Sequence, residues 1–142
     1  MIRLKSILKE TLSFVLIFFI IEGCSRTTTI EKNPEFNVDL QTLEGNLKML
    51  INFEHANISG IEKRTDEKIT TELQVRITNG INLPKENLDM EILVKKIAAQ
   101  FKYELKNEKD FMNIRVFFEE QSNGNLINVK KYKSWVFKIQ DL

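Results

Sequence analysis

The 142-residue sequence contains few of the residues from which catalytic and metal sites are usually built. It has one cysteine, one histidine, two prolines and five glycines. With a single cysteine (Cys24) there is no intrachain disulfide, and the lack of a Cys/His cluster argues against a structural zinc site. A catalytic triad that contains histidine could be built only around His55. We therefore expect no cofactor and no bound metal.

Phosphate-binding loops and basic surfaces are also missing. The glycines beyond residue 24 stand alone, so no Gly-rich loop precedes a helix. Lysine and arginine together number 21, against 20 aspartate and glutamate residues. Residues 1–23 hold three of the basic and two of the acidic residues, which leaves 18 of each sign in the rest of the chain. Because nucleic-acid-binding proteins usually carry a basic excess, we expect no nucleic-acid partner.

One long hydrophobic run is present, close to the N-terminus. Residues 1–10 carry three basic side chains, and residues 11–21 (TLSFVLIFFII) are apolar apart from Thr11 and Ser13. This arrangement is typical of a secretory signal. The run is shorter than the about 20 apolar residues that a transmembrane helix needs. An uncleaved signal anchor and a buried apolar helix are the alternatives.

The end of this run, Ile21-Glu22-Gly23-Cys24, resembles a bacterial lipobox, the four-residue signal of envelope lipoproteins. Ile21, Gly23 and Cys24 match that pattern, whereas Glu22 stands where a small residue is expected. The resemblance implies cleavage before Cys24, a diacylglycerol thioether on its sulfur and usually a further acyl chain on its amine. Two or more chains are what stable anchoring requires. By the family's sorting rule, Ser25 favours the outer over the inner membrane in a Gram-negative host.

The chain divides into three parts on this basis. The signal peptide covers residues 1–23, the lipidated cysteine and a flexible tether cover 24–37, and a single domain covers 38–142. Residues 25–37 are polar, include Pro34 and show no sustained periodicity, which is typical of a tether. The remaining residues are numerous enough to bury a core without disulfides.

Two segments show the period of an amphipathic helix. In residues 38–54, apolar side chains recur at spacings of three and four, with Asp39 as a candidate N-cap and His55 at the helix end. A weak alternation at 47–53 leaves a strand as the alternative. Residues 84–106 form the clearer helix, which begins at Pro84. Its wide apolar stripe comprises Leu88, Leu93, Ile97, Phe101 and Leu105, supported by Met90, Val94 and Ala98.

Four segments predict strands. The segment 58–65 is short and mixes apolar and polar residues without a clear period. The segments 69–78 and 112–119 alternate between apolar and polar side chains. A hairpin signal at Ser122–Asn125 leads to a last strand that ends with Trp135, Phe137 and Ile139 on one face. Because the lysines at 130, 131 and 133 fit neither face, we expect a bulge or a long loop there. The order αββαββ predicts an α+β two-layer sandwich, in which two helices cover one face of about four mainly antiparallel strands.

Carboxylates are the remaining candidates for chemistry. Glu119 and Glu120 are adjacent, so they point to opposite faces of a strand, which is poor geometry for an acid–base pair. Across the expected hairpin they lie near Lys130 and Lys131. Cross-strand charge pairing accounts for both sets, and an anion or headgroup site is the alternative.

Three side chains form a candidate partner surface. Phe117 and Val136 have the opposite parity to the core residues of their strands. If the helices cover one sheet face only, both emerge on the other face, together with Tyr132. Exposed apolar patches mark partner surfaces. The alternatives are that the tether or a chain end covers them, or that a bulge turns one inward.

These features predict a lipid-anchored envelope protein that is not an enzyme. We expect it to contact the membrane through lipid on Cys24, and we expect its domain to bind an envelope protein or another envelope component. Two alternatives stay open: an envelope hydrolase whose carboxylates the sequence does not place, and a purely structural lipoprotein.

Overall fold

The computed structural model describes residues 27–66, 68–123 and 128–142. The signal segment, the lipobox-like sequence and Cys24 therefore lie outside the described residues. The described elements are β1 (Thr28–Glu31), α2 (Leu40–Leu50), β2 (His55–Thr65), β3 (Lys68–Thr78), α3 (Asn87–Glu104), the 3₁₀-helix η1 (Glu108–Asp110), β4 (Asn113–Asn123), β5 (Asn128–Lys138) and the 3₁₀-helix η2 (Ile139–Asp141).

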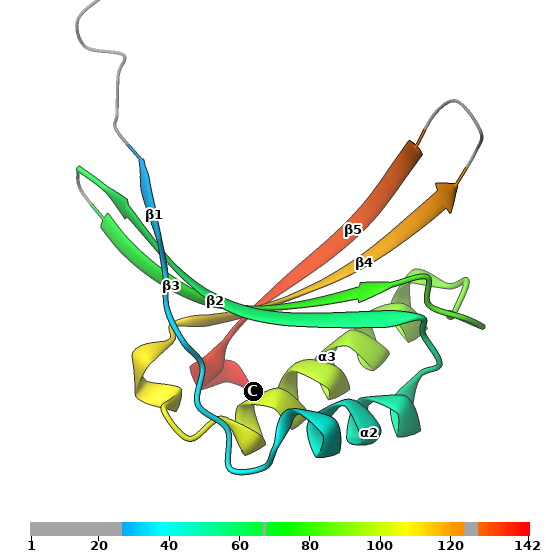
Figure 1. The fold of residues 1–142 in the computed structure, drawn as a ribbon, viewed down its shortest axis with the longest axis horizontal. Coiled ribbons are helices and arrows are strands. Elements are labelled where there is room, and N and C mark those ends of the chain that lie inside the picture. Colours follow the sequence, from blue (N-terminus) through cyan, green and yellow to red (C-terminus); the bar gives the residue numbers. More distant parts are fainter. Residues whose placement is uncertain (1–26, 67, 124–127) are drawn as a thin grey trace, which may run out of the picture.

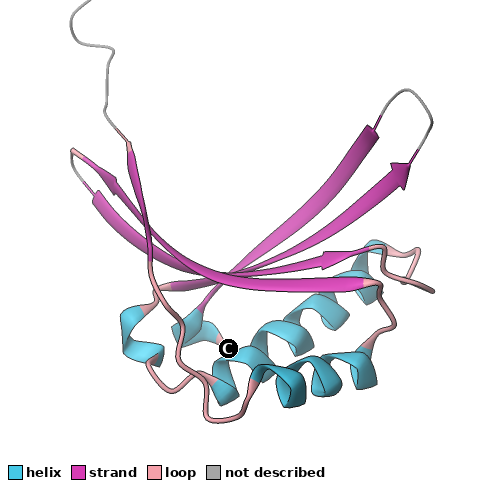
Figure 2. Ribbon diagram, in the orientation of Figure 1, coloured by secondary structure: helices cyan, strands magenta, loops and turns pink. Residues whose placement is uncertain are grey.

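The strands form one curved sheet with both α-helices on the same side (Figures 1 and 2). Its order is β1-β2-β3-β4-β5. Three neighbouring pairs are antiparallel, and β3 and β4 are parallel because α3 carries the chain back between them. The expected α+β class is confirmed. The strand number is five rather than about four, and the sheet is mixed.

The additional strand is β1, which lies within residues 24–37, where the sequence predicts a flexible tether. Residues 28–31 pair with β2 from Thr28↔Arg64 to Glu31↔Ile61. Further along, Phe36 bridges to Leu105 and packs edge-on against Phe101, with 6.3 Å between the ring centroids. All four β1 residues are exposed, so backbone pairing rather than apolar alternation holds this strand in the sheet. Periodicity therefore could not reveal it.

Helix α2 begins as expected and ends early. The Asp39 side chain accepts a hydrogen bond from the Thr42 backbone N–H at 2.8 Å, which satisfies an N-terminal donor of the helix. This bond lowers the pKa of Asp39 below its usual 3.8. Ile51 has extended backbone, and His55 is the first residue of β2 rather than the end of the helix.

Helix α3 buries most of the expected apolar stripe, with Leu88 as the exposed exception. The helix begins at Asn87, three residues after Pro84. Leu88 is 68% exposed, whereas Val94 and Ala98 are fully buried against the sheet. The buried residues of α3 are Met90, Val94, Ile97, Ala98 and Phe101. They pack on the side chains that β3 and β4 direct toward the helices, namely Leu73, Val75, Ile77, Ile114, Val116 and Phe118.

The expected bulge in β5 is wrong. Pairing with β4 runs in a constant register from Asn113↔Lys138 to Asn123↔Asn128. Lys131 and Lys133 therefore have the same parity as Trp135 and Phe137. The β4–β5 hairpin extends beyond the helical layer (Figure 1), so lysines on that side still reach water. A break in the hydrophobic pattern here marks the end of the helical cover and not a break in the strand.

Gly60 supplies a test of how β1 is attached. A Cβ added at Gly60 would lie 2.1 Å from the Lys32 carbonyl oxygen and 2.8 Å from Phe111 Cε1. Both neighbours are held, because Lys32 N–H donates to Gly60 C=O and Phe111 is buried. We predict that Gly60→Ala lowers the free energy of unfolding by about 1–3 kcal/mol.

The matched control is Ser59→Ala, on the opposite face of β2, which should change the free energy of unfolding by less than about 0.5 kcal/mol. Urea denaturation followed by Trp135 fluorescence measures both. Equal stabilities for the two variants would contradict the close approach of residue 32 to β2.

Candidate binding surface

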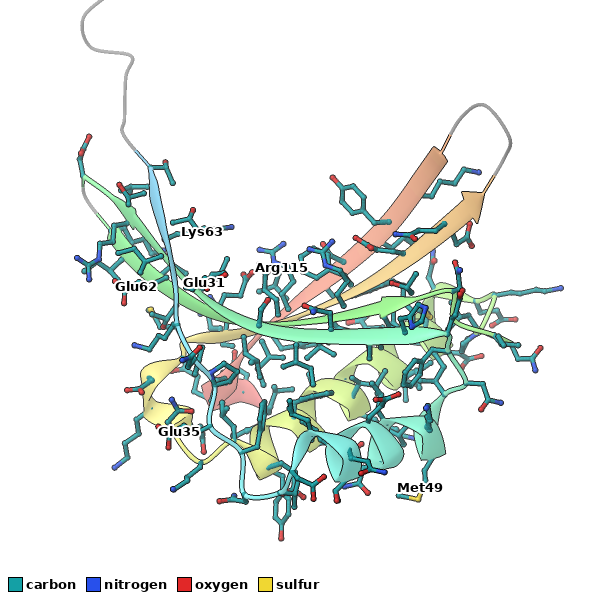
Figure 3. The ribbon with its side chains drawn as sticks, in the orientation of Figure 1. Glu31, Glu35, Met49, Glu62, Lys63 and Arg115 are labelled. Carbon is teal, nitrogen blue, oxygen red and sulfur yellow. The ribbon has the colours of Figure 1, made fainter. Side chains whose placement is uncertain are left out.

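The face of the sheet opposite the helices is rich in arginine, glutamate and aromatic residues. Strand alternation and register bring together Glu72, Gln74 and Arg76 of β3, Arg115, Phe117 and Glu119 of β4, and Tyr132, Ser134 and Val136 of β5. Figure 3 shows Arg115 on this side, directed away from α2 and α3. We call this set of residues the open face.

The three residues of the candidate partner surface all lie on the open face. Val136 is opposite Arg115, and Tyr132 is opposite Glu119. Tyr132 is 70% exposed and Val136 is 45% exposed, whereas Phe117 is half-buried. They are neighbours in one surface, although Phe117 is more enclosed than the sequence predicts.

Two guanidinium groups account for the partial burial of Phe117. Arg76 Cζ lies 4.6 Å from the ring centroid, and Arg115 Cζ lies 5.8 Å from it. Arginine over an aromatic ring is attracted by the negative charge of the ring face. Phe117 is thus shielded by cations of its own sheet rather than by a helix.

Each of these arginines is paired with a carboxylate. Arg115 Nε donates to Glu72 Oε1 at 2.9 Å, and Arg76 donates to Glu119. Glu72 also accepts from Gln74 Nε2 at 2.7 Å. Glu72 and Glu119 are only 4% and 7% exposed, so their charges depend on these partners. The cluster pairs two arginines with two glutamates, so its charges balance, and it places guanidinium groups beside the Phe117 ring.

The register across the hairpin places Glu120 opposite Lys131, as expected, whereas the expected pairing of Glu119 with a hairpin lysine is wrong. Glu119 pairs with Arg76 of β3 and lies opposite Tyr132 in the hairpin. Glu120 lies opposite Lys131, and Lys130 lies opposite Gln121. Glu119 and Glu120 are adjacent in β4 and therefore lie on opposite faces of the sheet, as expected. The cation beside Glu119 is Arg76, from the parallel neighbour β3.

A cavity of about 540 Å³ lies on the other side of the hairpin, facing the loop before α3. Buried Met90 and Phe118 line it together with three exposed lysines, Lys85, Lys131 and Lys133. Of the two carboxylates at its wall, Glu119 is already paired with Arg76. The cavity therefore combines apolar walls with an excess of positive charge.

The other described residues that could act in catalysis or metal binding do not form a cluster. His55 is exposed, and its Nε2 atom lies 3.5 Å from Glu54 Oε1. Among the described residues, no group of three His, Cys, Asp or Glu side chains is placed to hold a metal ion. None of the described helices is long and apolar enough to cross a membrane.

Comparisons with known proteins give little for this chain. No family model matches it, and no curated protein matches it. Among solved structures, the crystal structure of the sex pheromone staph-cAM373 precursor is similar, with a TM-score of 0.42 and 9% sequence identity. The match covers 79% of this chain and 39% of that chain, so this chain spans about two fifths of that protein's length. We draw nothing about function from this likeness.

Adjacent phenylalanines test the two faces of β4. We predict that Phe118→Ala, in the core, lowers the free energy of unfolding by about 3–5 kcal/mol. Phe117→Ala should lower it by only about 1–2 kcal/mol, because what it loses is contact with two arginines at a partly open site. Urea denaturation of the purified protein measures both. A larger loss for Phe117→Ala than for Phe118→Ala would show that Phe117 is a core residue.

Proposed function

We propose that this protein is a lipid-anchored protein of the bacterial envelope whose domain binds a partner. The observation that carries the anchor is the lipobox-like sequence Ile21–Cys24 at the end of a basic-then-apolar N-terminal segment. A folded domain follows it at once, since β1 begins at Thr28. This order is what an exported protein held by lipid requires.

The position of β1 brings the domain close to the anchor. Four residue steps separate Cys24 from Thr28, and an extended chain spans at most about 3.6 Å per residue. If Cys24 carries lipid, the Cα atom of Thr28 therefore lies within roughly 14 Å of the Cα atom of the acylated cysteine. The sheet would sit beside the membrane surface rather than at the end of a long tether.

The open face supports the binding part of the proposal. Arginine and aromatic residues are enriched at the centres of protein interfaces. Here two arginines, Phe117 and Tyr132 lie on one sheet face that neither described α-helix covers, and each arginine is paired with a glutamate. Such a surface is preorganised, so a partner would lose little of its binding energy to ordering these side chains.

The fate of Cys24 is the direct test of the anchor. Cells that express the protein are labelled with a fatty acid and fractionated. We predict that the wild-type protein takes up label and sediments with membranes, and that Cys24→Ser abolishes labelling because no thioether can form.

Glu22→Ala is the matched variant, since it restores the small residue of the lipobox pattern at the neighbouring position. It should be labelled at least as completely as the wild-type protein. Absence of label from both wild type and Glu22→Ala would contradict the anchor.

A further inference from the structure

We propose that the outer edge of β5 binds an extended acidic segment of a partner polypeptide as an added strand. This inference rests on the proposed binding function and gives the site and the chemistry of the partner. β5 is the last strand in the sheet order, and no described residue pairs with its outer side. Its eleven residues form a long edge, whereas β1, at the opposite edge, has four.

Hydrogen-bond directions identify the free backbone groups of this edge. Asn79 N–H donates to Glu119 C=O at 2.8 Å, so Glu119 turns its backbone toward β3. Ile139 N–H donates to Met112 C=O at 3.0 Å, so the odd-numbered residues at this end of the chain turn toward β4. Because alternate residues of a strand point their backbone groups to opposite sides, Tyr132, Ser134 and Val136 direct N–H and C=O outward. These are the groups that an added strand would bond.

The charge of β5 indicates what kind of segment could be added beside it. β5 contains no acidic residue, and Lys131, Lys133 and Lys138 make no ion pair with any described residue. Two copies of β5 placed edge to edge would bring lysines against lysines, so a second copy of this chain is disfavoured. An acidic segment would instead meet complementary charge.

Side-chain parity gives the sequence pattern of the partner. Lys131 and Lys133 project to the side of the cavity that Lys85 also lines, whereas Tyr132 and Val136 project to the open face. A strand added beside β5 alternates its side chains between the same two sides. The matching segment therefore alternates acidic residues, which face the lysines, with apolar residues, which face Tyr132 and Val136.

A synthetic ten-residue peptide of alternating valine and glutamate is the probe. It is labelled with a fluorophore and titrated with the detergent-solubilised mature protein, and fluorescence anisotropy reports binding. Trp135 is a second reporter, because it is the only tryptophan, lies in β5 and packs edge-on against Phe118 at 6.1 Å. We expect saturable binding, a change in Trp135 emission, and at least roughly tenfold weaker binding to the double variant Lys131→Glu/Lys133→Glu.

Two controls separate strand addition from general attraction between opposite charges. The same peptide with every residue N-methylated keeps its charge but has no backbone N–H left to donate from either edge, and it should not bind. Ser134→Pro removes an outward N–H without removing a β4–β5 bond, and it should weaken binding, whereas Ser134→Ala should not. Circular dichroism checks that each variant is folded.

Equal binding of the N-methylated and unmodified peptides to the wild-type protein would overturn the proposal, because the attraction would then be that of any polyanion. Absence of saturable binding to the wild-type protein would also overturn it. Either result, obtained with protein that carries fatty acid on Cys24, would leave the lipid anchor standing. The two proposals can therefore fail separately.

Discussion

The rest of this structure depends on one constraint: both α-helices pack on the same face of the sheet. The central strands β3 and β4 then bury alternate side chains under these helices and leave the others without cover from them. In β3 this separates Leu73, Val75 and Ile77 from Glu72, Gln74 and Arg76. The open face is a direct result of that separation, and it concentrates polar and aromatic residues on one side of the molecule.

Paired charges make the open face compact without a second helical layer. Glu72 and Glu119 are nearly buried although neither α2 nor α3 lies over them, because an arginine from the neighbouring strand closes over each carboxylate. The same arginines flank Phe117. Removal of one member would leave its partner with an uncompensated charge, which costs more than the pair itself contributes. The network thus fixes the shape of the surface more than it adds to stability.

Strong periodicity made part of this fold predictable. The ten alternating residues of 69–78 predict the strand β3. The apolar spacing of 84–106 predicts the helix α3, but it does not show that Leu88 in the first turn is exposed. Asp39 could be recognised as a cap because its role is local. The parity of Phe117 and Val136 was enough to place both on the open face.

The features that the sequence does not reveal are those set by pairing between distant segments. β1 is exposed on every residue and has Ile30 as its one apolar side chain, so its place in the sheet comes mainly from backbone pairing with β2. The partners of Glu72 and Glu119 follow from the parallel register of β3 and β4, which no local pattern encodes. The lysines of β5 suggested a bulge only because the length of the helical layer, which ends before them, was unknown.

Strand addition at β5 requires that the outer edge of this strand is free, and amide hydrogen exchange measured residue by residue by NMR tests this directly. In β5, the N–H groups of Lys131, Lys133 and Trp135 point toward β4, whereas those of Tyr132, Ser134 and Val136 point outward. We predict that exchange alternates along β5, slow for the first set of N–H groups and fast for the second. Slow exchange at all six positions would show that the edge of β5 is already covered, and would contradict this prediction.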